Sequence, residues 1–231
     1  MSLNGIAASA LSTLQTNSTA LGVVSDNVAN LNTQGYARRV VQEQTLTTGG
    51  QLSGVDIASI QRVADQFLNQ EVLTAGGTSS QYDTQSAIFN QLNSLLGQPG
   101  DDSSLTTSLS NVFSALGQAA LSPTASASQV GVVNAFQNLA SNIANLSSSI
   151  TGLQNQVDQQ VTSTVSSANS LIQQIYNLNT QVQAAVAKGD TSTSLLDQRD
   201  LAVQNLSQIM GIRSVPTTNG GVQIFTDDGI S

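Results

Sequence analysis

The residues best suited to chemistry are two carboxylates on either side of an arginine: Asp197, Arg199 and Asp200. On a helix, Asp197 and Asp200 lie three positions apart and face the same way. A metal site needs more ligands than these two, and the chain contains no His and no Cys to supply them. We therefore interpret the group as a helix-start charge cluster, in which the carboxylates favour the positive end of the helix dipole.

No other part of the sequence is a good candidate for catalysis. The Gly-Gly pairs at 49–50, 76–77 and 220–221 lack the Lys and Ser/Thr that follow in a phosphate-binding loop. The segment 227–229, Asp-Asp-Gly, lacks the later Glu of a calcium loop and is interpreted as a turn. The serines have no His to activate them. We predict that the protein is not an enzyme, with no catalytic residue, no cofactor and no metal.

Composition and charge narrow the class of protein further. The chain has 231 residues, a net charge of −8, 9% charged residues and only 3% aromatic residues. Aliphatic side chains must therefore do the packing, which suits thin helical bundles. The six cations form no basic patch, so we expect no binding to nucleic acid. They are Arg38, Arg39, Arg62, Lys188, Arg199 and Arg213.

The N-terminus lacks the positive region of a cleaved signal peptide, and polar residues interrupt its apolar positions. No segment approaches the roughly 20 apolar residues that a membrane-spanning helix needs. We therefore expect no membrane insertion.

The element that organises the rest is a helix within residues 1–36. Apolar residues recur along it in alternating steps of three and four over four heptads, which is the pattern of a coiled-coil seam. We predict that these residues form an assembly interface: Leu3, Ala7, Ala10, Leu14, Leu21, Val24, Val28 and Leu31. Asn17 is the one polar residue in the two rows, and a buried Asn commonly fixes the register of such a seam. Because no charge precedes Asp26, the helix suits a crowded assembly.

The end of this helix is also marked. Asn30 and Asn32 tolerate the left-handed conformation that ends helices, and Gly35 adopts it at no steric cost. Thr33 can close a local turn onto the backbone. Tyr36 then places an apolar ring with a polar tip where the chain turns away. The sequence therefore predicts a helix end followed by a change of direction.

We predict a mainly α fold with a short β-hairpin connector and the start of a β domain. The predicted segments are an N-terminal coiled-coil helix (1–36), an extended or hairpin connector (37–60), an elongated antiparallel helical bundle (61–211) and a truncated β domain (212–231). In the connector, Gly54 is expected to form a bulge or bend.

Within the bundle the apolar pattern predicts helices over 61–96 and 126–188, the second roughly 90 Å long. A shorter helix between them is expected to be capped by the Asp101–Ser103 cluster. Gly76-Gly77 is a soft spot in an otherwise continuous helix. The last helix is expected to open at Ser192 or Ser194, with Ser194 and Asp197 at capping-box spacing.

Two motifs resemble those of bacterial flagellar axial proteins. Residues 29–38 resemble the Ala-Asn-x-Asn-Thr-x-Gly-Tyr/Phe-x-Arg signature of flagellar rod, hook and hook-associated proteins. The matching positions are Asn30, Asn32, Thr33, Gly35, Tyr36 and Arg38. Residues 195–200 resemble the Leu-Leu-Asp-Gln-Arg-Asp motif of hook-associated proteins 1 and 3, where it is structural. It comprises Leu195, Leu196, Asp197, Gln198, Arg199 and Asp200.

The two motifs together resemble the hook-associated protein 1 (FlgK) family, although Arg39 stands where that family frequently has Gln. The resemblance implies a structural subunit that joins the flagellar hook to the filament. It implies that copies form a homo-oligomeric ring in the flagellar axis. The implied partners are the hook protein below the ring, hook-associated protein 3 above it and a flagellar export chaperone. Export through the flagellar type III apparatus without a cleaved signal would place the protein in the extracellular flagellum.

In that family the N-terminal axial helix pairs with a C-terminal helix of the same chain, which this sequence lacks, so we expect an N-terminal fragment. Two alternatives stay open. One is another axial protein, of the hook or rod, and the other is a secreted fibrous or adhesin-like module with no flagellar role.

Overall fold

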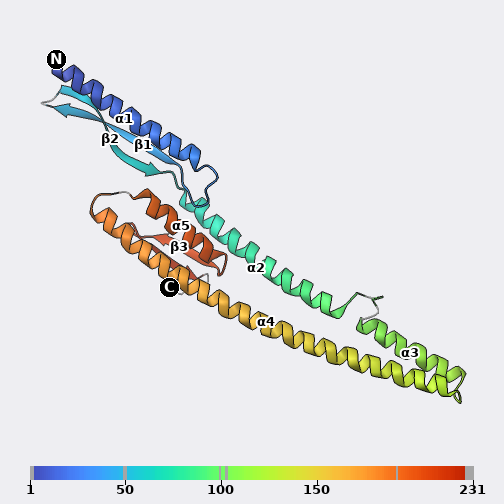
Figure 1. The fold of residues 1–231 in the computed structure, drawn as a ribbon. Helices are drawn as coiled ribbons and strands as arrows, with labels where there is room; N and C mark the ends of the chain where they lie inside the picture. Colours follow the sequence, from blue (N-terminus) through green and yellow to red (C-terminus); the bar gives the residue numbers. More distant parts are fainter. Residues whose placement is uncertain (1–2, 49–50, 99, 102–103, 191, 227–231) are drawn as a thin grey trace. The chain divides into compact units, whose positions relative to one another are not determined.

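The computed structural model describes residues 3–48, 51–98, 100–101, 104–190 and 192–226. Over these residues the chain forms five helices and four strands, shown in Figure 1. They are α1 (Leu3–Ala29), β1 (Arg39–Thr48), β2 (Gln51–Arg62), α2 (Gln66–Leu96), α3 (Leu105–Leu121), α4 (Ser126–Ala187), α5 (Thr193–Ser207), β3 (Ile212–Pro216) and β4 (Val222–Thr226). The predicted mainly α class is confirmed. The turns expected at 49–50 and 227–229 lie outside the described residues.

The chain divides into two compact units. One comprises Met1–Ser80 and Ser167–Ser231, and the other comprises Gln81–Ser166. This division differs from the boundaries drawn on the sequence, which placed 61–211 in a single bundle. Helices α2 and α4 each contribute one part to each unit, because both continue through the division without a break.

In the first unit, α1 lies along the antiparallel β1–β2 hairpin (Figure 1). The hairpin pairs Arg39 with Arg62 at its base, and its register shifts between Leu46 and Thr47, opposite the segment that holds Gly54. Gly54 has a φ of +155°, and a side chain there would collide with Ser12 of α1. The bend expected at Gly54 is thus confirmed, and its reason is the close approach of the helix.

The face of α1 that meets the hairpin is largely polar. Thr16 and Val23 are buried there. Thr16 Oγ1 donates to the carbonyl oxygen of Val55 at 3.2 Å, and Val55 N donates to Ser12 Oγ at 3.3 Å. All eight apolar residues predicted as an interface are exposed, with Leu14 at 67% and Leu21 at 70%. Asn17 is exposed too, so in the single chain it is not a buried register residue.

The core of the first unit lies where α2, α4, α5 and β3 meet. It contains Leu73, Ile175, Leu178, Ala202, Val203, Leu206 and Ile212. β3 and β4 pair antiparallel beside it, which confirms the hairpin expected near the C-terminus. Asn179 ties α4 to this hairpin, because its side chain exchanges two hydrogen bonds with the backbone of Val222 at 2.8 and 3.0 Å.

Two predicted helix starts were wrong. The helix expected from residue 61 begins at Gln66, because β2 continues to Arg62 and the Asp65 carboxylate caps α2 by accepting from Phe67 N and Leu68 N. In the second unit the cap of α3 is Ser104, whose Oγ accepts from Thr107 N at 3.1 Å, rather than the 101–103 cluster. Residues 102–103 themselves lie outside the described residues.

The second unit holds α3 against the first half of α4. Val112 and Ser108 of α3 are buried, and Asn142 of α4 donates a hydrogen bond to Ser108 Oγ.

At the C-terminal end of α4, Gly189 has a φ of +76° and ends the helix, as the sequence predicts. The predicted span 126–188 is thus correct to within one residue.

Helix α2 runs through Gly76-Gly77 without interruption, as predicted, and its two glycines differ in surroundings. A Cβ on Gly76 would meet nothing within 4 Å, whereas one on Gly77 would lie 2.8 Å from the carbonyl oxygen of Ser207. Gly77 therefore allows the end of α5 to approach the backbone of α2.

We predict opposite effects of Ala at these two positions. Gly76→Ala should raise the free energy of unfolding by about 1 kcal/mol, because it restores helix propensity without a clash. Gly77→Ala should lower the free energy of unfolding, because the added methyl displaces the end of α5. Urea unfolding followed by circular dichroism measures both, and a stabilising Gly77→Ala would contradict the close approach.

Candidate functional site

The principal long-range interaction of the first unit is made by Asp197 in the second turn of α5. Its Oδ2 lies 3.0 Å from Arg39 Nη2, and its Oδ1 lies 2.8 Å from Arg62 Nε, an ion-pair contact without hydrogen-bond alignment. The backbone N–H of Ala37 donates to Oδ1 at 3.3 Å. Because Arg39 and Arg62 face each other at the base of the hairpin, one carboxylate ties both strands and the preceding loop to α5.

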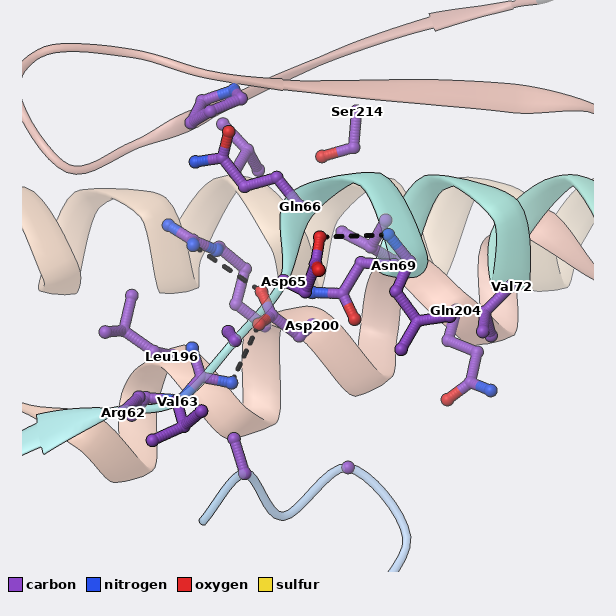
Figure 2. Close-up of a pocket in the computed structure, with 18 of the residues that line it drawn as sticks. Arg62, Val63, Asp65, Gln66, Asn69, Val72, Leu196, Asp200, Gln204 and Ser214 are labelled. Carbon is purple, nitrogen blue, oxygen red and sulfur yellow. Dashed lines mark hydrogen bonds and ion pairs between the residues drawn. The ribbon is translucent and has the colours of Figure 1, made fainter. Parts of the chain in front are cut away.

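Asp200 and Arg199 extend this contact. Arg62 Nη2 donates to Asp200 Oδ2 at 2.8 Å, and Arg199 Nη2 lies 3.5 Å from Asp200 Oδ1. Arg199 Nη1 donates to the carbonyl oxygen of Gly220 at 2.7 Å, which ties the β3–β4 hairpin to the same place. Figure 2 shows Arg62 reaching the carboxylate of Asp200. We call Arg39, Arg62, Asp197, Arg199 and Asp200 the joint cluster.

The joint cluster is poorly solvated. The side chain of Arg199 is 8% exposed and that of Asp197 is 12% exposed. Burial lowers the pKa of the Arg199 guanidinium, Asp200 opposes this shift, and the positive charge of Arg62 adds to it. A guanidinium stays protonated throughout the physiological range even so, which makes the cluster permanently charged.

The sequence interpretation of these carboxylates was incomplete. Asp197 and Asp200 do lie near the start of α5, but their oxygens bind guanidinium groups of the connector. The Ser194–Asp197 capping box does not form, because Asp197 is held by this distant partner set and α5 begins at Thr193 without a side-chain cap bond. Among the described residues no group of three or more acidic, His or Cys side chains could hold a metal ion.

The motif at 29–38 builds the turn that leads into the joint cluster. Gly35 has a φ of +81°, as the sequence predicts, and a Cβ there would lie 2.9 Å from the Cβ of Leu201 in α5. Tyr36 donates its hydroxyl to Asn27 Oδ1 at 3.0 Å, and the guanidinium of Arg39 lies 4.9 Å from the centre of the Tyr36 ring. The left-handed position and the aromatic ring are therefore both used in packing the connector.

Sequence reasoning missed three residues that hold this turn, namely Asn27, Arg39 and Arg62. Asn27 exchanges two hydrogen bonds with the backbone of Arg39, donating to its carbonyl oxygen at 2.8 Å and accepting from its N–H at 2.9 Å. Arg39 was noted as a cation and as a departure from the family, and Arg62 as a cation within the helix expected from residue 61. The predicted connector ended at residue 60, so no predicted element paired the two arginines, whereas the observed β2 pairs them by continuing to Arg62.

The other motif residues have simpler places. Thr33 N and Oγ1 donate to Asn30 O at 2.9 Å and Oδ1 at 3.2 Å, closing the turn expected after α1. Asn32 and Arg38 are exposed. Leu195 packs against the core, and Leu196 lines a pocket of about 750 Å³ between the connector, α2 and α5 (Figure 2).

We predict that the carboxylate of Asp197 matters more than that of Asp200. Asp197→Asn leaves the guanidinium groups of Arg39 and Arg62, 18% and 10% exposed, without their shared counter-charge, and should cost about 3 kcal/mol of unfolding free energy. Asp200→Asn, at a side chain 33% exposed, should cost about 1 kcal/mol or less. Urea unfolding measures both variants. Equal losses of unfolding free energy would show that the two carboxylates contribute equally to stability.

We also predict a graded response at Gly35. Gly35→Val should be worse than Gly35→Asn, because Asn tolerates a positive φ and a β-branched residue costs roughly 1–3 kcal/mol there. Both add a Cβ 2.9 Å from the Cβ of Leu201, so Leu201→Gly, which removes that atom, should reduce the penalty of Gly35→Asn in a double-mutant cycle. Additive penalties would mean that the Leu201 contact is not limiting.

Comparison with known proteins gives two family matches. Residues 89–231 match the model of the flagellar hook-associated protein FlgK helical domain. Residues 8–36 match the model of flagella basal body rod proteins.

The chain is also similar to several individual proteins. It is 28% identical over 222 residues to flagellar hook-associated protein 1 of Bacillus subtilis, covering 91% of this chain and 44% of the relative. It is 29% identical over 224 residues to flagellar hook-associated protein 1 of Salmonella typhimurium, covering 94% and 40%. Flagellar hook protein FlgE of Caulobacter vibrioides is 37% identical over 81 residues, covering 35% of this chain and 14% of that protein.

The chain spans about two fifths of the length of the hook-associated proteins that it matches. The helical-domain match at 89–231 extends over more than half of the chain. The chain therefore belongs to the flagellar hook-associated protein FlgK helical domain family.

Proposed function

We propose that this chain is part of a structural subunit of the bacterial flagellum that joins the hook to the filament. The observation that carries the proposal is the combination of an axial-type N-terminal segment with the FlgK helical domain in one chain. The relatives named hook-associated protein 1 align over more than nine tenths of this chain. A hook or rod protein accounts for the N-terminal match alone and leaves residues 89–231 unexplained.

The proposed assembly surface is the exposed side of α1, formed by its eight apolar seam residues. Large apolar side chains left in water are unfavourable by roughly 1.5–3 kcal/mol each relative to burial, and a continuous stripe of them marks an interaction surface. The polar side of α1 is already used by the hairpin, so the stripe can receive a partner without disturbing the fold. By family resemblance, that partner is the C-terminal helix of the full-length chain, with copies arranged in a ring.

The further partners proposed from the family are the hook protein, hook-associated protein 3 and an export chaperone. The proposed location is the extracellular flagellum, reached through the flagellar type III apparatus without a cleaved signal. Searching the described residues for a helix both long and apolar enough to cross a membrane yields none.

The use of the carboxylates supports a structural role rather than an enzymatic one. The carboxylate oxygens of Asp197 and Asp200 face guanidinium groups of the same chain, a use that accounts for them as structural ion pairs. We therefore propose that the Leu-Leu-Asp-Gln-Arg-Asp motif fixes the connector to α5 and performs no reaction.

We predict that Leu14→Asp or Leu21→Asp blocks joining of filament to hook. Both side chains are exposed in the single chain, so folding should be preserved, whereas a carboxylate in the packed seam would cost several kcal/mol. The readout is electron microscopy and swimming of a deletion strain complemented with the full-length gene. Retained hooks without filaments is the expected result.

Gln15→Asp is the matched control, because Gln15 is exposed on the same helix but outside the two apolar rows. It should join filaments normally. Normal filaments in the Leu14→Asp and Leu21→Asp strains would refute the seam as an assembly surface.

A further inference from the structure

The positive charges of this chain are concentrated in one place, contrary to the expectation from the sequence that the six cations form no basic patch. Four of the six cations, Arg38, Arg39, Arg62 and Arg199, lie at the base of the β1–β2 hairpin and the adjoining start of α5. The carboxylates beside them are Asp65, Asp197 and Asp200, so this region carries +1. Because the whole chain carries −8, the remainder carries −9. The region is a positive site on an otherwise acidic molecule.

Within this region the guanidinium of Arg38 is the one that remains available. Its side chain is exposed, and across the part of the chain that the structure describes no carboxylate pairs with it. By contrast, Asp65 is engaged in capping α2, and Asp197 and Asp200 are engaged by the other arginines. An incoming carboxylate would therefore meet no competitor at Arg38.

Arg38 lies on the lining of the pocket of about 750 Å³ described above. The same lining includes the apolar residues Val63, Leu68 and Val72, whose side chains are 48%, 62% and 44% exposed. Figure 2 shows Val63 and Val72 on this lining. A positive group beside an apolar recess suits an acidic side chain with a methylene stem, because the stem can cover apolar surface while the carboxylate pairs with Arg38.

The same hairpin carries such a side chain further along. Glu43 of β1 is exposed, and no hydrogen bond or ion pair of its side chain is found within the described residues. Asp56 of β2 is exposed as well, and its Oδ1 accepts a hydrogen bond from the backbone N–H of Ile57. At about 3.3 Å per residue, Glu43 lies about 16 Å along the strand from Arg38. The hairpin thus has a positive base and an acidic middle.

We propose that Glu43 of one copy binds Arg38 and the adjoining pocket of a second copy, so that hairpins of neighbouring copies associate with an offset. Hairpins in register would oppose like charges, whereas an offset of about 16 Å pairs opposite ones. A contact between two different surfaces is heterologous and generates a ring or a helical array. The proposal rests on the proposed function, since it supplies a lateral contact for copies in the flagellar axis.

The absence of cysteine from the chain gives a direct test. Arg38 and Glu43 are kept, and the cysteines are placed beside them. Ala64 is exposed and lines the same pocket as Arg38, and Thr45 is exposed two residues from Glu43 on β1. Purified Ala64→Cys chains are mixed with Thr45→Cys chains and oxidised, and the disulfide-linked heterodimer, called the Arg38–Glu43 cross-link, is quantified. The yield should exceed that of Ala64→Cys mixed with Lys188→Cys, an exposed control, by roughly fivefold, and should fall severalfold between about 50 mM and about 500 mM NaCl.

Charge reversal completes the test in the full-length protein. Arg38→Glu and Glu43→Arg should each impair joining of filament to hook, and the double variant should restore it. Yields equal to the Lys188→Cys control, or no rescue by the double variant, would overturn the proposal. Protection of Arg38→Cys from a thiol reagent in the full-length monomer would also overturn it, because the occupant would then be the C-terminal part of the same chain.

The outcome is separable from that of the proposed function. If Leu21→Asp blocks joining but the Arg38–Glu43 cross-link is absent, the proposed function stands and this contact fails. If the cross-link forms but the Leu21→Asp strain joins filaments to hooks normally, the Arg38–Glu43 contact is supported and the seam is refuted as an assembly surface.

Discussion

The first unit depends on the ion pairs of one carboxylate with little exposure to solvent, that of Asp197. Removing one partner of such a contact leaves the others charged and poorly solvated, which costs far more than the contact adds to stability. The main consequence of these ion pairs is that they fix the position of the connector, rather than that they add stability. The two strands of the connector, fixed to each other by their own register, are fixed to α5 through Arg39 and Arg62. The connector, along which α1 lies, is therefore fixed to α5 within the first unit.

The second constraint is the choice of face by which α1 packs. In a globular protein the apolar rows of a helix turn inward, because burial of apolar surface supplies most of the stability. Here α1 turns Ser12, Thr16 and Asn27 toward the hairpin and binds it largely by hydrogen bonds, with Val23 adding an apolar contact. A helix held in this way keeps its apolar rows available. The fold thus leaves an exposed apolar surface on α1, the helix that lies along the fixed connector.

Much of this could be predicted from the sequence, and the failures have physical causes. The N-terminal helix, the left-handed Gly35, the bend at Gly54 and the long α4 depend on local spacing and backbone preference, which sequence carries directly. The side of α1 that packs could not be predicted, because a small polar face gives no periodic signal. The pairing of Arg39 with Asp197 joins positions 158 residues apart, and no local rule links them. Two predictions of helix starts were wrong. For α2, strand β2 continues to Arg62, and for α3, Ser104 caps the helix in place of the 101–103 cluster.

The chemistry of the joint cluster explains why its cations are arginines. A guanidinium keeps its charge even where burial lowers its pKa, as at Arg199, so the cluster cannot be discharged by a basic shift in pH. Its planar fork also serves several acceptors at once: Arg62 contacts both Asp197 and Asp200, and Arg199 contacts Asp200 and the Gly220 carbonyl. A lysine would offer a single point charge, lose the flat face that Arg39 lays over Tyr36, and titrate when buried. The chain has few charges, and three of its arginines, Arg39, Arg62 and Arg199, lie in the joint cluster. There they link the connector, α5 and the β3–β4 hairpin.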